Sequence, residues 1–140
     1  MDIVVPVNYL AVLVCGIASM VLGFVWYGPL FGKKWMQLSG ISMQGGSKSA
    51  MHRSYAVAFV ASLVTAYVLA HIVVFSATYF GISGLSAGLQ AGFWSWLGFV
   101  GPVTLGMVLW ERKPWTLWIL LNGYQLLLML VMGAILALWQ

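Results

Sequence analysis

Four long stretches of the chain are almost wholly apolar and contain no Asp, Glu, Lys or Arg. They cover approximately residues 4–27, 55–75, 85–110 and 115–139. A helix needs about 20 mainly apolar residues to cross the ~30 Å hydrocarbon core of a bilayer. The pattern therefore predicts an all-α integral membrane bundle of four transmembrane helices, forming a single domain over residues 1–140.

Composition supports this prediction and excludes several classes of protein. The chain is 63% hydrophobic and 6% charged, whereas soluble domains have about 25% charged residues. This composition excludes a soluble enzyme and a disordered chain. A disulfide scaffold is excluded because Cys15 is the single cysteine. The first stretch has no basic residues before it and no small-residue cleavage site after it, so we expect a retained helix and not a signal peptide.

The six basic residues predict the orientation. They occupy the first and third connections, as Lys33, Lys34, Lys48 and Arg53 in one and Arg112 and Lys113 in the other. The second connection, residues 76–84, has no charge, and Asp2 is the one charged residue near either terminus. By the positive-inside rule, loops one and three are cytoplasmic and both termini lie outside.

Aromatic residues cluster beside these basic residues, as is typical of a membrane interface. The interface residues predicted in this way are Trp26, Tyr27, Lys33, Lys34, Trp35, Trp110, Arg112, Lys113 and Trp115. We expect the basic ones to bind anionic lipid on the cytoplasmic side. Residues 33–38 predict a short amphipathic interfacial helix, and residues 45–49 a flexible connector.

Small residues recur at spacings of four, which lets helix backbones approach closely. Gly84, Gly88 and Gly92 form such a series in the third stretch, Ser19 and Gly23 a pair in the first, and Gly133 with Ala137 a pair in the fourth. We expect helix-packing interfaces at these positions, either within the chain or with another chain. Trp94 and Trp96 fall on nearly opposite faces, so one of them should face lipid or a partner.

The polar residues inside the stretches are the candidate chemistry of the chain. His71, Gln90 and Asn8 reach a similar depth on three stretches and could form a polar cluster, a ligand site or a proton-sensitive switch. Asn122 and Gln125 share one face of the fourth stretch and suit either interhelical hydrogen bonds or a solute site. For each group, structural hydrogen bonding is the competing interpretation.

Catalysis is not indicated. Asp2 and Glu111, the only carboxylates, fall at opposite faces of the membrane, and no metal or cofactor motif is present. We therefore expect no enzyme, no cofactor, no metal and no nucleic-acid partner.

The two halves of the chain are faintly alike. Leu22-Gly23 before Trp26 corresponds to Leu105-Gly106 before Trp110, and basic residues follow in both halves. A tandem pair of helical hairpins would produce this likeness, and chance is the alternative. Gly101-Pro102 predicts a kink in the third stretch.

Several segments of the chain resemble an uncharacterised bacterial membrane-protein family, domain of unknown function 1761. The run from Asn8 to Leu13 and the run from Trp26 to Trp35, with sequence WYGPLFGKKW, are similar to the opening signature of that family. Later segments that resemble it are residues 58–63, 97–99, 111–112 and 122–125. Gln125 departs from the family, in which a His often follows the Gly-Tyr pair. The resemblance implies a multi-pass protein of the bacterial inner membrane and brings no activity or cofactor with it.

Two functions remain open from the sequence. The first is a non-enzymatic membrane protein that acts as a homo-oligomer or as an accessory subunit of a larger membrane complex, with contacts through the Gly84, Gly88 and Gly92 face. The alternative is a small oligomeric channel or carrier for a small solute, with a path past His71, Gln90, Asn122 and Gln125.

Overall fold

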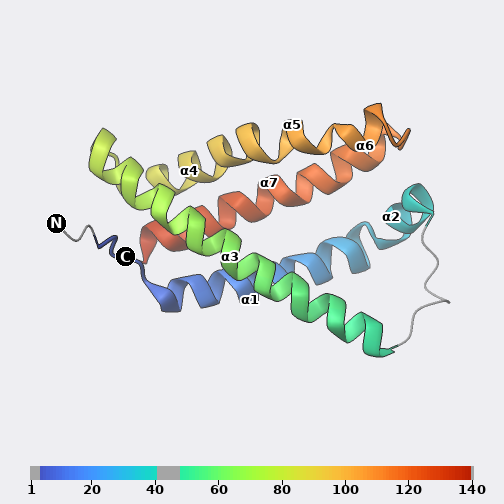
Figure 1. Ribbon diagram of the computed structural model, residues 1–140, viewed down its shortest axis with the longest axis horizontal. Coiled ribbons are helices and arrows are strands. Elements are labelled where there is room, and N and C mark those ends of the chain that lie inside the picture. Colours follow the sequence, from blue (N-terminus) through green and yellow to red (C-terminus); the bar gives the residue numbers. More distant parts are fainter. Residues whose placement is uncertain (1–3, 41–47, 140) are drawn as a thin grey trace.

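The computed structural model describes residues 4–40 and 48–139, and these residues form a helical bundle (Figure 1). The elements are α1 (Tyr9–Val25), the π-helical turn η1 (Trp26–Leu30), α2 (Gly32–Ser39), α3 (Lys48–Phe80), α4 (Gly84–Phe99), α5 (Gly101–Thr104), α6 (Gly106–Leu109) and α7 (Trp115–Leu138). Four stretches are long and apolar enough to cross a membrane: Tyr9–Leu30, Ser49–Phe80, Gly84–Leu109 and Trp115–Leu138. The predicted all-α bundle with four membrane-spanning helices is confirmed.

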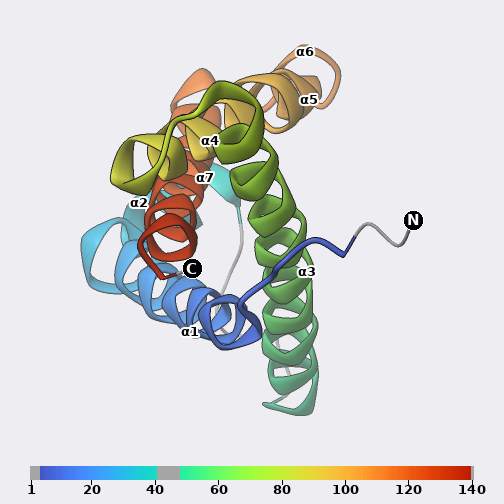
Figure 2. The ribbon, with the colours of Figure 1, turned by 90° about the vertical axis from the view of Figure 1, so that its left-hand side faces the viewer.

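Helix α7 lies in the middle of the bundle, between α4 on one side and α1 on the other (Figure 1). Helix α3 crosses α1 obliquely and extends away from the other helices, as Figure 2 shows. The start of α1 and the end of α7 lie at one end, where Asn8 Nδ2 donates to the Trp139 carbonyl oxygen at 2.9 Å. We call this the terminal end. The opposite end, with α2 and the turn between α6 and α7, is the basic end.

The first membrane helix begins five residues later than the apolar pattern indicates. The Asn8 side chain accepts hydrogen bonds from the backbone amides of Leu10 and Ala11, at 3.1 and 3.2 Å. An asparagine in this role satisfies amides that have no partner in the first turn, and so it fixes where the helix starts. Residues 4–8 are not helical.

The first helix does not end at Tyr27. It passes through η1, in which the Phe31 amide donates to the Trp26 carbonyl at 2.9 Å, five residues back. Pro29 lies inside this turn and has no amide hydrogen to donate, which favours a wider turn at this place. Gly32 follows because an added Cβ would lie 2.6 Å from the Tyr27 carbonyl oxygen. The predicted short helix over residues 33–38 is present as α2.

Helix α3 is longer than the apolar stretch that it contains. It has 33 residues, about 50 Å at a rise of ~1.5 Å per residue. Residues 48 and 49, predicted as part of a flexible connector, belong to this helix; residues 45–47 lie outside the described residues. The second connection shortens to residues 81–83, where Gly81 and the following Gly84 have φ angles of 64° and 68°.

The third membrane helix is broken where the Gly101-Pro102 pair predicted a kink. Helix α4 ends at Phe99, and two single turns, α5 and α6, continue in a similar direction to Leu109 (Figure 1). Pro102 has no amide hydrogen, so the carbonyl one turn earlier loses its usual partner.

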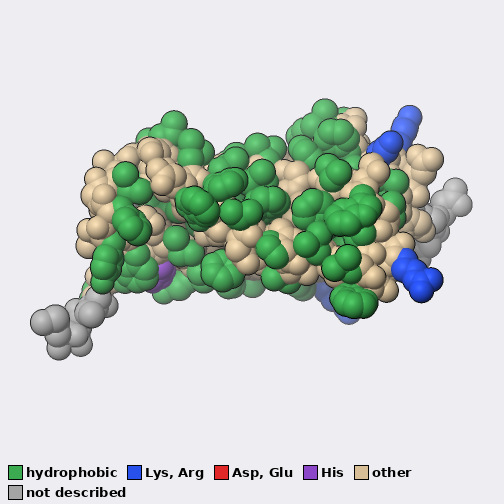
Figure 3. Space-filling model, turned by 90° about the horizontal axis from the view of Figure 1, so that it is seen from above, with side chains coloured by type: hydrophobic (Ala, Val, Ile, Leu, Met, Phe, Trp, Pro, Cys, Tyr) green, Lys and Arg blue, Asp and Glu red, His purple; other side chains and the backbone are tan. Residues whose placement is uncertain are grey.

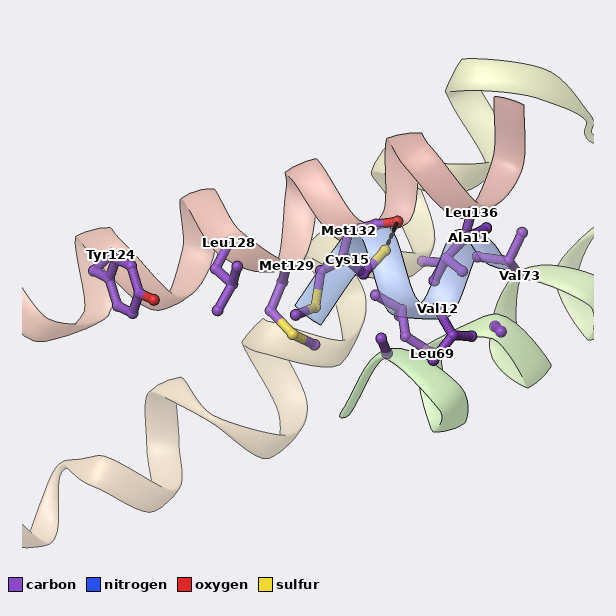
Figure 4. Close-up of a cluster of buried hydrophobic side chains, with 13 residues drawn as sticks. Ala11, Val12, Cys15, Leu69, Val73, Tyr124, Leu128, Met129, Met132 and Leu136 are labelled. Atoms are coloured by element: carbon purple, nitrogen blue, oxygen red, sulfur yellow. Dashed lines mark hydrogen bonds between the residues drawn. The ribbon is translucent and has the colours of Figure 1, made fainter. Parts of the chain in front are cut away.

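The core of the bundle lies between α1, α3 and α7 (Figure 4). Its fully buried large side chains are Leu69, Met132 and Val73, together with Cys15 and Ser19. The Cys15 thiol donates to the Met132 carbonyl at 3.7 Å. The contacts pair α1 with α3 and α4 with α7, which is the pairing that two consecutive hairpins would give.

Candidate functional site

Glycines bring α4 and α7 together backbone to backbone. A Cβ added at Gly88 would lie 2.6 Å from the Gly133 carbonyl carbon and 2.7 Å from Ala137 Cβ. A Cβ added at Gly92 would lie 2.8 Å from the Met129 carbonyl carbon. The helix-packing interface predicted at Gly88 and Gly92 is therefore formed inside the chain, with α7, and not with another chain.

Gly84 has a different role in the same series. Its φ angle is 68°, and no described atom lies within 4 Å of an added Cβ. This backbone conformation favours glycine on conformational grounds alone. Gly84 therefore forms the entry to α4 and not a contact between helices.

The interior polar site is built around Asn122, which is 3% exposed. Its side-chain Nδ2 donates to Thr104 Oγ1 at 2.9 Å and to the Trp118 carbonyl at 3.1 Å, and its Oδ1 accepts from Trp96 Nε1 at 3.3 Å. Both amide hydrogens and the amide oxygen are thus in use. Asn122 on α7 joins α4 and α5 across the break at Gly101.

Thr104 is the second centre of this network. Its hydroxyl donates to the Val100 carbonyl at 2.9 Å and accepts from Asn122 Nδ2 and from Trp118 Nε1, the latter at 3.1 Å. A hydroxyl has one donor and two acceptor positions, so this arrangement satisfies all three. The network joins the two sides of the helix break, and it uses both amide hydrogens of Asn122 and one lone pair of its oxygen.

Sequence reasoning identified Asn122 but missed Thr104, Trp96 and Trp118 as its partners. The available signal was Pro102, because a proline kink frees backbone carbonyls that threonine side chains and neighbouring helices then satisfy. Gln125, expected to share the role of Asn122, is half-buried and is not one of the hydrogen-bond partners of Asn122.

A second contact joins the π-helical turn to α7. Trp26 Nε1 donates to the Leu120 carbonyl at 3.2 Å, and the Tyr27 ring packs edge-on against Tyr124 with centroids 5.2 Å apart. Tyr124 is buried, and its hydroxyl donates to the Ser19 carbonyl at 3.0 Å. Gly23 lies against the same hydroxyl, which an added Cβ would approach to 3.2 Å. These residues therefore pack helices inside the chain.

Of the other residues predicted to lie at the membrane interface, Trp35 is half-buried and the rest are exposed. Trp110 is 83% exposed, and Trp115 is also exposed. Lys33, Lys34, Arg112 and Lys113 are exposed too. In Figure 3, Lys and Arg side chains gather at the basic end of a surface that is otherwise largely apolar.

The polar side chains near the terminal end do not gather into one site. His71 Nδ1 hydrogen-bonds to the Tyr67 carbonyl on its own helix at 2.9 Å. Gln90 Nε2 donates to Ser86 Oγ on its own helix at 3.1 Å. Asn8 caps α1 and reaches Trp139. The three side chains predicted as a cluster thus bond to three different parts of the chain.

Of the two tryptophans on opposite faces of α4, Trp96 points inward to Asn122, and Trp94 points outward and is 61% exposed. Within the described residues, every buried side-chain nitrogen and oxygen has a hydrogen-bond partner. Over the same residues, no three His, Cys, Asp or Glu side chains lie together as metal ligands would.

Comparison with known proteins gives one positive result. No curated protein and no solved structure matches the chain. Residues 10–137, which is nearly the whole chain, match the model of a family described as "Protein of unknown function (DUF1761)". The chain belongs to this family, as the resemblance of its WYGPLFGKKW segment indicated.

Proposed function

We propose that this protein is a non-enzymatic subunit of a membrane-embedded assembly, formed with copies of itself or with another membrane protein. The observation that carries the proposal is the outward face of α4, which consists of Ser86, Gln90 and Trp94. All three side chains are exposed in the single chain, and spacings of four place them on one side of the helix.

Exposing the Gln90 amide to lipid is energetically unfavourable. Gln90 lies six residues after the start of α4, about 9 Å along the axis at ~1.5 Å per residue. Ser86 takes one of its amide hydrogens, and the other amide hydrogen and the oxygen need partners that hydrocarbon does not supply. A neighbouring transmembrane helix with a polar group supplies them, and Trp94 adds a large apolar contact one turn away.

The orientation in the membrane is part of the same proposal. The exposed Lys33, Lys34, Arg112 and Lys113 support a cytoplasmic basic end that binds anionic lipid heads, in a bacterial inner membrane. Each basic residue near an anionic surface contributes about 1 kcal/mol to such binding. Both termini then lie on the outer side.

Native mass spectrometry of the protein, extracted gently from its own membranes, tests the assembly. We expect the wild type to carry additional copies or a stoichiometric foreign subunit. Gln90→Leu and Trp94→Ala should each release the single chain, whereas Ile119→Ala, at a 62% exposed apolar position on α7, should not.

Either composition of the assembly supports the proposal, and the mass distinguishes a homo-oligomer from an accessory subunit. A wild-type protein that is a monomer under these conditions contradicts it. So does an assembly that survives both α4 substitutions.

A further inference from the structure

Two hollows follow one another along the crossing of α1 and α3. The first, of about 340 Å³, is lined by Tyr9, Val12, Leu13, Leu63, Val64 and Tyr67. The second, of about 470 Å³, is lined by Pro6, Val7, Asn8, Val74, Ala77 and Thr78. On α3, residues 63–67 line the first hollow and residues 74–78 line the second. On the facing segment, residues 9–13 line the first hollow and residues 6–8 line the second. The two hollows therefore lie one after the other along the crossing, with the second nearer the terminal end.

The two hollows differ in chemistry. The first is lined only by aliphatic and tyrosine side chains, and the rings of Tyr9 and Tyr67 stack there with centroids 6.4 Å apart. Its volume falls at the lower end of the ~300–1,000 Å³ that is typical of sites for small molecules. The second has two polar side chains in its wall, Asn8 and Thr78. An apolar segment beside a more polar one is the profile of an amphiphile.

Along α3, His71 lies between Tyr67, which lines the first hollow, and Val74, which lines the second. Positions 67, 71, 74 and 78 share one face of α3, because they are spaced by four, three and four. The His71 ring packs edge-on against Tyr67 with centroids 4.6 Å apart, and its Nδ1 bonds to the Tyr67 carbonyl at 2.9 Å. A carbonyl oxygen only accepts, so Nδ1 carries the hydrogen, and Nε2 of the neutral ring is left as an acceptor. The ring is only partly buried.

The charges of the chain decide which head group suits this position. Lys33 and Lys34 lie on α2, Arg112 and Lys113 precede α7, and Lys48 and Arg53 lie in the first two turns of α3, far along the helix from His71. An anionic head would therefore find no such side chain beside His71. A zwitterionic head that donates a hydrogen bond to Nε2 fits better.

We infer that the α1–α3 crossing binds one phospholipid whose head carries N–H donors. Its acyl chain occupies the apolar hollow, and its ammonium group donates to His71 Nε2. Phosphatidylethanolamine has this chemistry. Phosphatidylcholine has the same charge and the same chains, but its trimethylated nitrogen has no N–H group. The site is separate from the α4 face and does not depend on assembly.

The test is lipid retention, measured by native mass spectrometry after delipidation and exposure to equal amounts of phosphatidylethanolamine and phosphatidylcholine with identical acyl chains. We expect the wild type to keep one phosphatidylethanolamine per chain, with roughly five-fold preference, the equivalent of ~1 kcal/mol for one hydrogen bond. His71→Phe keeps a ring without the acceptor, so it should bind both lipids equally. Val64→Trp should fill the apolar hollow and abolish retention of both.

Three further variants keep the test decisive. Ile119→Trp adds the same bulk on the exposed side of α7 and should leave retention unchanged. Leu13→Trp fills the hollow from the opposite wall and replaces Val64→Trp if that variant fails to fold. Gln90→Leu should retain lipid normally, which separates this inference from the proposed assembly. Wild-type protein without a bound lipid, equal retention of the two lipids, or an unchanged preference in His71→Phe overturns it.

Discussion

Replacing Gly88 by Ala tests the tightest contact in the bundle. One methyl group at this position would meet the Gly133 backbone, with the carbonyl carbon 2.6 Å away, and Ala137 Cβ at 2.7 Å. Neither neighbour is the end of a flexible side chain, so α4 and α7 must move apart. Extra atoms in a well-packed core that force backbone shifts typically cost ~1–3 kcal/mol. We expect Gly88→Ala to destabilise the fold by this amount.

Gly98→Ala is the matched control on the same helix. No described atom lies within 4 Å of a Cβ added there, so the methyl group meets no obstacle. Alanine is favoured over glycine inside a helix by up to ~1 kcal/mol. Gly98→Ala should therefore be neutral or slightly stabilising, and the two alanine variants should differ by about 1–4 kcal/mol.

Reversible unfolding in mixed detergent micelles, followed by circular dichroism and tryptophan fluorescence, measures this difference. The reasoning requires a lower free energy of unfolding for Gly88→Ala than for Gly98→Ala. Equal values for the two variants would show that the helices can separate without cost. The same would hold if Gly98→Ala were the less stable variant.

Three further substitutions test the hydrogen bonds to α7 in the same unfolding assay. Asn122→Leu keeps the side-chain size but removes the bonds to Trp96 and Thr104; at ~0.6–1.7 kcal/mol per interhelical bond, it should cost about 1–3 kcal/mol. In a double-mutant cycle, Thr104→Val should cost less in that variant than in the wild type, because the bond to Asn122 is already lost and the one from Trp118 remains; full additivity would mean that the network is not coupled. Tyr124→Phe loses only the bond to the Ser19 carbonyl and should cost ~0.6–1.7 kcal/mol; an unchanged unfolding curve would contradict the role of this hydroxyl.

The sequence predicted the number of membrane helices because hydrocarbon excludes charged residues so strongly that their absence marks each span. It predicted the helix ends less well. Ser54 and Thr78 hydrogen-bond to carbonyls four residues earlier, at 3.0 and 2.9 Å. A polar side chain that hydrogen-bonds to a carbonyl of its own helix does not terminate that helix. Helix α3 therefore continues past its apolar stretch at both ends. Polarity locates the edge of the membrane, whereas caps and glycines locate the end of the helix.

The sequence predicted which residues make close contacts, but not which helix or chain they contact. A glycine series shows that something approaches closely at Gly88 and Gly92, and it cannot say whether the neighbour is α7 or another chain. The spacing of Trp94 and Trp96 likewise shows opposite faces without showing which face is inside. In both cases the deciding information is the position of α7, through the Gly133 backbone and the Asn122 amide. That position arises from tertiary packing and leaves no local pattern in the sequence.

The hydrogen bonds of the polar side chains support the proposal of a binding role on the outside of the bundle. Asn122, Thr104 and Tyr124 bond to neighbours inside the chain, so a solute passing through the interior would first have to break bonds that hold α4, α5 and α7 together. Gln90 on α4 and His71 on α3 have polar atoms with hydrogen-bonding capacity left over, and both side chains are at least partly exposed. Atoms of this kind gain most from a partner in the membrane, since hydrocarbon offers them none. Binding on these two surfaces therefore needs no change in the bundle, whereas transport through the interior requires that its interhelical hydrogen bonds break.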